Sequence, residues 1–190
     1  MSVRPALSVA EFFHEVLTAA LRSQAVPTSE MTEFYLVNLL ADFTHAPIAE
    51  EPLGLKLAQA MADGPEQRLR GLREVGDTAL YVSGFFGESL ERRLVALDYY
   101  ISMGGSAYAA LAGLLRMSRE GETLGGVYGE LSDKFPRFVD VLAEVSEKSA
   151  LGSNRGVLRL YERWVRTHSE WVARKLMACG MIPPRGGQTQ

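Results

Sequence analysis

Hydrophobic and polar residues alternate at helical spacing along most of the chain, most clearly over residues 68–115. Advancing by about 100° per residue from Leu69 gathers the apolar and small residues of 69–86 on one side, which predicts an amphipathic helix. Three small residues make a shallow groove in its apolar side, Gly76, Ala79 and Ser83. The groove is the kind of surface to which a second helix packs closely.

The other side of this helix is predicted to face solvent. It carries Arg70, Arg73, Glu74, Asp77, Tyr81 and Gly84. The charged residues stand four apart, as Arg70 with Glu74 and Arg73 with Asp77, which is the spacing of helical ion pairs. These charges are therefore expected to form a solvated face.

The partner helix is predicted to begin at Ser89, a suitable N-cap, and to run to Leu115. The two helices would then join at residues 86–89. Gly104-Gly105 interrupts the second helix, and each glycine costs about 1 kcal/mol relative to alanine in a helix interior. Three explanations would account for this cost: a kink in the helix, close packing of another backbone, or a ligand contact.

Further helices are predicted from periodicity and capping residues. Ser8 and Glu11 have the spacing of a capping box. The predicted helices cover residues 8–24, 28–45, 53–62, 123–135, 136–151 and 155–179. The stretch 34–43 is apolar almost all round and is expected to be central.

Together these elements predict an all-α fold, a single-domain bundle of seven or eight helices with a tightly packed central helix pair. The domain is expected to cover residues 1–180, and residues 181–190 are expected to form a flexible tail.

The composition bears on the partner class and the cellular compartment, but it does not indicate an activity. The net charge of −3 does not favour nucleic acid as a partner. Cys179 is the single cysteine, so no internal disulfide forms and a reducing compartment is expected. Neither a signal peptide nor a transmembrane segment of about 18 apolar residues is predicted, so we expect a cytoplasmic location.

Two carboxylate-x-x-His pairs are the only pattern that suggests a metal. They are Glu11 with His14 and Asp42 with His45, and i,i+3 spacing turns both side chains of a pair to one side of a helix. Glu11 already has a capping role, and His45 lies at the end of its helix before Pro47. Capping and solvated charge are the preferred interpretation, and no metal or cofactor is predicted.

Two further sets of residues are candidate sites. A ligand pocket at the central pair would be lined by Gly76, Ser83, Asp98, Tyr100, Gly104 and Tyr108. A basic, aromatic face on the last predicted helix would carry Arg159, Arg163, Trp164, Arg166 and Trp171. That face suits docking of a partner protein, although the tryptophans also suit packing against the bundle or a second copy.

No catalytic motif is present, so the sequence does not indicate a reaction. The preferred hypothesis is a cytoplasmic interaction or regulatory module that binds another protein or itself, for example as a homodimer. The alternative is a bundle that binds an apolar small molecule or cofactor at the central helix pair, with or without enzymatic use of it.

Overall fold

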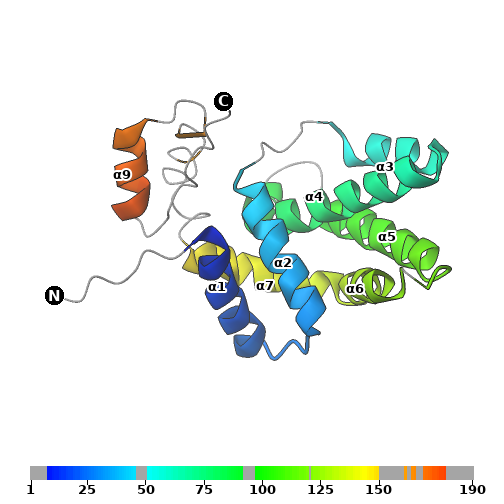
Figure 1. Cartoon of the computed structure of the whole chain (residues 1–190), viewed down its shortest axis with the longest axis horizontal. Helices are drawn as coiled ribbons and strands as arrows, with labels where there is room; N and C mark the ends of the chain where they lie inside the picture. The colour runs from blue at the N-terminus through cyan, green and yellow to red at the C-terminus, as the bar shows by residue number, and fades with distance from the viewer. Residues whose placement is uncertain are drawn as a thin grey trace.

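The structure, a computed structural model, describes residues 8–45, 51–91, 97–119, 121–149, 161, 164–165 and 169–178 (Figure 1). These residues form eight α-helices and no strand, which confirms the predicted all-α fold. In chain order the helices are α1 (Val9–Ser23), α2 (Glu30–Phe43), α3 (Leu53–Ala62), α4 (Pro65–Glu91), α5 (Leu97–Leu115), α6 (Glu122–Asp133), α7 (Phe135–Lys148) and α9 (Glu170–Ala178).

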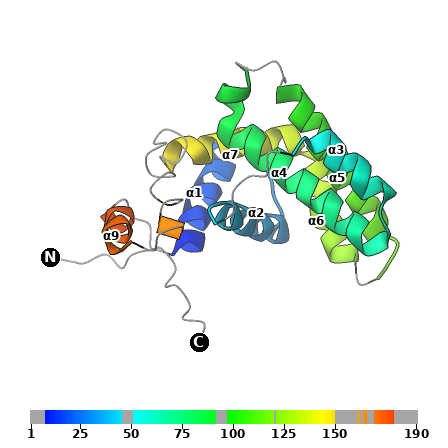
Figure 2. The ribbon, with the colours of Figure 1, turned by 90° about the horizontal axis from the view of Figure 1, so that it is seen from above.

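The predicted central helix pair is present as α4 and α5. Helix α4 also packs against α3 and α7, and α5 also packs against α6. Figures 1 and 2 show α3, α4 and α5 running side by side, with α1 and α2 on the other side of the molecule. Helix α4 therefore connects the two halves of the bundle, because it contacts α2 as well.

Small residues allow α4 and α5 to lie this close. A Cβ atom at Gly76 would overlap the ring of Tyr108. A Cβ atom at Gly104 would overlap Phe135 and would lie 2.7 Å from the Cβ of Ala79. Of the three explanations for the glycine pair, close packing is the one observed at Gly104, within an uninterrupted α5.

A break in the helix is present where the junction at residues 86–89 was predicted, because Phe86 is not helical and two helical segments of α4 meet there in a kink. The segment after Phe86 (φ −122°, ψ 16°) runs to Glu91, so Ser89 lies inside a helix and is not the predicted N-cap of the partner helix. Helix α5 then begins at Leu97, eight positions later than predicted. The second half of α4 is also enclosed, because Tyr81 is 4% exposed and Leu142 fills the space beside Gly84.

Helix α2 is not central, contrary to its apolar composition. Phe34 is 64% exposed and Met31 is 48% exposed, while the buried residues Leu36 and Leu40 lie on the opposite face. An apolar composition on every side of a helix therefore does not show whether the helix is buried or lies at the surface with apolar side chains exposed.

The last predicted helix, 155–179, is broken at Ser169, which is not helical and is followed by α9. Tyr161 and Trp164 are buried, and the Tyr161 hydroxyl forms a hydrogen bond with Nδ1 of His45. The C-terminal part of the chain is thereby joined to the end of α2. The predicted tail lies outside the described residues.

Candidate binding groove along helix α4

The outward face of the first half of α4 is the base of a groove. Its residues recur at spacings of three and four, at Gln67, Arg70, Gly71, Glu74, Asp77 and Thr78. The opposite face holds Leu72 and Val75, which are fully buried and fix the rotation of the helix. The same amphipathic pattern that buries one face therefore presents a row of polar side chains on the other.

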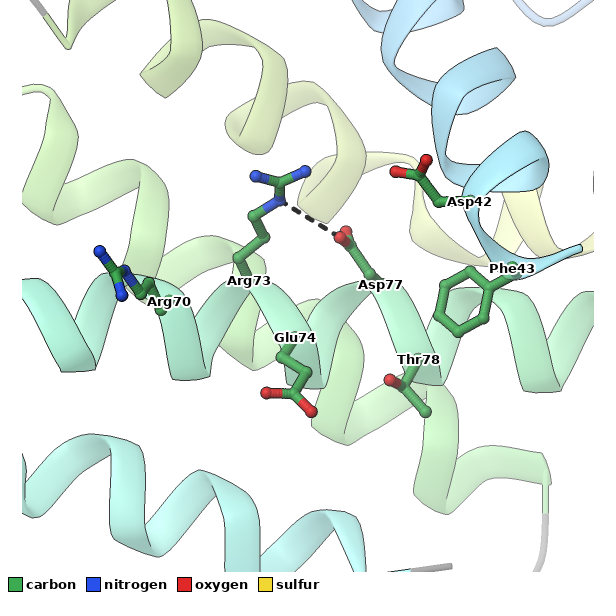
Figure 3. Close-up of a pocket in the computed structure, with 7 residues that line it drawn as sticks. All are labelled: Asp42, Phe43, Arg70, Arg73, Glu74, Asp77 and Thr78. Carbon is green, nitrogen blue, oxygen red and sulfur yellow. Dashed lines mark ion pairs between the residues drawn. The ribbon is translucent and has the colours of Figure 1, made fainter. Parts of the chain in front are cut away.

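The first part of the groove is a hollow of about 320 Å³ between α2 and α4 (Figure 3). It is lined by Asp42, Phe43, Arg70, Arg73, Glu74, Asp77 and Thr78. In Figure 3 the charged groups of Arg73, Asp77 and Asp42 lie on the side facing α2, and Glu74 points the opposite way. Phe43 stacks on Tyr81 with ring centroids 4.4 Å apart, so the aromatic wall of this hollow is held in place.

The second part is a hollow of about 370 Å³ between α3 and α4. It is lined by Glu51, Lys56, Gln59, Ala60, Asp63, Gln67, Arg70, Gly71 and Glu74. Arg70 and Glu74 line both hollows, so the two adjoin along α4. We call these two adjoining hollows together the α4 groove.

Asp77 anchors the base of the groove through contacts with three helices. Its Oδ1 accepts hydrogen bonds from the hydroxyl groups of Tyr35 on α2 (2.6 Å) and Tyr108 on α5 (2.7 Å). Its Oδ2 lies 3.4 Å from Nε of Arg73, and the Arg73 guanidinium lies over the Tyr35 ring. Tyr128 on α6 packs edge-on against Tyr35 and stacks on Tyr108. Four helices therefore meet around one carboxylate.

Burial determines the electrostatics of this cluster. It raises the pKa of Asp77, and the hydrogen bonds from Tyr35 and Tyr108 and the charge of Arg73 only partly oppose the rise. Burial and the Asp77 charge also raise the pKa of Tyr108 well above its ordinary value. Asp77 already accepts two phenolic hydrogen bonds and pairs with a guanidinium, so it has little capacity left to bind a substrate. Its evident effect is to hold Arg73 and the groove floor rigid.

The sequence predicted both ion pairs of α4, and the structure contains one of them. Arg73 pairs with Asp77 as predicted. Glu74 pairs with Lys56 of α3 instead of Arg70, because α3 lies along that side of the helix. A tertiary neighbour thus replaced the partner that helical spacing suggested.

The residues proposed as a pocket at the central pair take part in packing. The Tyr108 ring fills the space beside Gly76, and Phe135 and Ala79 fill the space beside Gly104. The Ser83 hydroxyl donates to the carbonyl of Ala79 within its own helix (2.6 Å). Of the other two candidates, Asp98 is exposed and Tyr100 is partly buried. Tyr108 does not line the α4 groove, but its hydroxyl group donates a hydrogen bond to the lining residue Asp77.

The two carboxylate–histidine pairs make different contacts in the structure. Glu11 accepts a hydrogen bond from the backbone N–H of Ser8 (2.8 Å) in the predicted capping box, while His14 is exposed. His45 contacts Tyr161, and Asp42 lines the α4 groove. Within the described residues, no group of three or more His, Cys, Asp or Glu is placed to hold a metal ion.

The predicted docking face on the last helix is described only in part. Trp164 is 8% exposed and packs beside Tyr161. Arg159, Arg163, Arg166 and the side chain of Trp171 lie outside the described part of the chain.

Sequence reasoning missed Tyr35, Phe43, Lys56 and Tyr128 as parts of the site. They come from three helices, α2, α3 and α6, and share no local spacing, so no motif could have grouped them. The one usable signal was the row of charges on the polar side of α4, which was interpreted as a solvated face.

No family model, curated protein or solved structure matches this chain. Across the residues that the structure describes, no helix has both the length and the apolar character needed to cross a membrane.

Proposed function

We propose that the protein is a helical interaction or regulatory module that binds a segment of another protein in the α4 groove. The adjacency of the two hollows supports this proposal, since both are lined by Arg70 and Glu74 and one segment can contact both. The α4 stretch from Gln67 to Thr78 is about 17 Å long at about 1.5 Å per residue. An extended segment of about five residues at about 3.3 Å each would cover it.

The rigidity of the groove floor is a second supporting feature. Tyr35, Tyr108 and Arg73 hold Asp77 from three directions, so α2, α4 and α5 keep their relative positions. A preformed site loses little conformational freedom when a partner binds, which favours affinity. The single cysteine, Cys179, favours a reducing compartment, and the cytoplasm is the location that we propose.

Selection of peptides from a random octapeptide display library tests this function. Thr78, which lines the hollow beside α2, would be replaced by tryptophan to fill the groove. Thr123→Trp is the matched control, because Thr123 is exposed on α6. Peptides enriched on the wild-type protein should bind Thr78→Trp at least about tenfold more weakly, and should bind Thr123→Trp as they bind the wild type.

Circular dichroism and thermal melting would establish that both variants are folded. The proposal fails if no peptide is enriched, or if the enriched peptides bind Thr78→Trp as well as they bind the wild-type protein.

A second candidate is an apolar small molecule bound in the hollow between α2 and α4. Its volume of about 320 Å³ lies at the lower end of the range of about 300–1,000 Å³ for ligand pockets. A fragment screen by ligand-observed NMR on the same three proteins tests it. Fragments that bind the wild type and Thr123→Trp but not Thr78→Trp, together with no enriched peptide, would favour this candidate over the first.

A further inference from the structure

When the ion pairs within the α4 groove are set aside, its lining carries more negative than positive charge. Asp77 pairs with Arg73, and Glu74 pairs with Lys56. The remaining charged residues of the lining are Asp42, Glu51, Asp63 and Arg70. None of these four forms an ion pair with another described residue. The groove therefore presents three carboxylates against one guanidinium.

The excess negative charge lies at both ends of the groove. Asp42 belongs to the wall formed by α2, in the first hollow. Glu51 and Asp63 flank α3, in the second hollow. Arg70 lines both hollows and so lies in the middle. A segment that spans the groove would meet a carboxylate near each of its ends.

The hollow beside α2 also offers an apolar contact. Phe43 is partly buried, and its ring is fixed by stacking on Tyr81 at an interplanar angle of 3°. Thr78 lies on the neighbouring turn of α4 and also lines the hollow. An apolar side chain would be covered here without displacing a charged group of the protein.

From this arrangement we infer that the segment bound in the α4 groove is basic, with lysine or arginine towards each end and one apolar side chain beside Phe43. The inference rests on the proposed function, because it specifies the chemistry of that same site. An acidic segment would place like charges together at both ends, and a neutral segment would cover the carboxylates without pairing them. Both arrangements are unfavourable.

The composition of the selected peptides tests this inference directly. Octapeptides enriched on the wild-type protein should carry net positive charge, and their affinity should fall as salt is added. The double variant Asp42→Asn/Asp63→Asn should bind them about five- to tenfold more weakly at low salt, since it removes two exposed pairing partners. Asp133→Asn, an exposed change on α6, is the control and should bind them as the wild type does.

The outcomes separate the inference from the function on which it rests. Enriched peptides that are neutral or acidic, or that bind the double variant as well as the wild type, overturn the inference and leave a peptide-binding groove. The absence of any peptide sensitive to Thr78→Trp overturns both.

Discussion

Asp77 is a charged residue of the groove whose surroundings differ strongly from water. Its side chain is 16% exposed, and two phenols and a guanidinium contact its oxygens. Partners of this kind stabilise the ionised form, yet burial outweighs them and the pKa is raised from its ordinary 3.8. The folded protein therefore holds the Asp77 proton more tightly than the unfolded chain does.

Asp77→Asn should consequently change how stability depends on pH. With a raised folded pKa, the wild-type protein is stabilised by protonation of Asp77 at low pH and loses that contribution as pH rises through the folded pKa. Asparagine does not titrate and can still accept hydrogen bonds from Tyr35 and Tyr108. The free energy of unfolding of the variant, relative to wild type, should therefore rise between about pH 4 and pH 7.

Urea unfolding at several pH values across that interval measures this difference. A difference that stays constant or falls with pH would show that burial does not dominate at Asp77.

The contacts of Asp77 include one that the sequence predicted and one that it did not. Arg73 and Asp77 were paired correctly, because i,i+4 neighbours on a helix meet whatever surrounds them. Tyr108 was selected as a candidate residue, but as part of a pocket rather than as a donor to Asp77. Its position depends on how α5 packs against α4, which local periodicity does not encode.

At the scale of elements, Gly104 and Gly113 of α5 provide a matched comparison. Gly104→Ala would force a Cβ atom into Phe135 and Ala79, and overpacking of this kind costs about 1–3 kcal/mol. Gly113 has no atom within 4 Å of such a Cβ, so Gly113→Ala should gain up to about 1 kcal/mol from helix propensity. Chemical denaturation of both variants measures this. Equal effects would mean that α4 and α5 are not in tight contact at Gly104.

A carboxylate of α6 fixes the beginning of α2. Glu130 accepts hydrogen bonds from the Ser29 hydroxyl (2.7 Å) and from Lys134 (2.8 Å). Burial alone would raise the pKa of Glu130, but hydrogen bonds from Lys134, Thr32 and Ser29 lower it to about 2. Because this value lies below the ordinary 4.5, Glu130 stabilises the fold above about pH 4.5, and this stabilisation is lost as pH falls towards 2.

Glu130→Gln should therefore destabilise the protein by about 1–2 kcal/mol at neutral pH, with a smaller loss below about pH 4.5. Glu147→Gln on α7 is an exposed control and should change stability by less than about 0.5 kcal/mol at neutral pH. Thermal melting of both variants at neutral pH and below about pH 4.5 measures these changes in stability. If Glu130→Gln were neutral at pH 7, its carboxylate would not be needed to hold α2 against α6.

The extent of most helices was predictable, and their surroundings were not. Residues 53–62 form a helix as predicted, because proline and glycine bound the apolar run on either side. The break at Phe86 was predicted, but the short helical segment that follows it to Glu91 was assigned to the partner helix, which begins only at Leu97. The position of α2 was missed because Phe34 and Met31 remain exposed, and composition does not show which side of an apolar helix is covered.

At the scale of the whole molecule, Tyr161 links the C-terminal part of the chain to the bundle. It is 1% exposed and belongs to the same hydrophobic core as Leu36 and Leu40 of α2. Burial raises the pKa of its hydroxyl to about 12, and that hydroxyl bonds to His45. Since one core includes both parts, we expect them to unfold in a single transition.

Two substitutions at Tyr161 test this cooperativity. Tyr161→Phe removes only the hydroxyl and should cost about 1 kcal/mol. Tyr161→Ala empties a buried aromatic site and should lower the stability of the whole protein by about 3–5 kcal/mol. Val165→Ala is the control, because Val165 is 36% exposed, and it should cost less than about 1 kcal/mol. If Tyr161→Ala left the melting of α1 to α7 unchanged while amide exchange in α9 increased, the C-terminal part would be a separately unfolding unit. The end of α2, with the groove residues Asp42 and Phe43, would then keep its position without Tyr161.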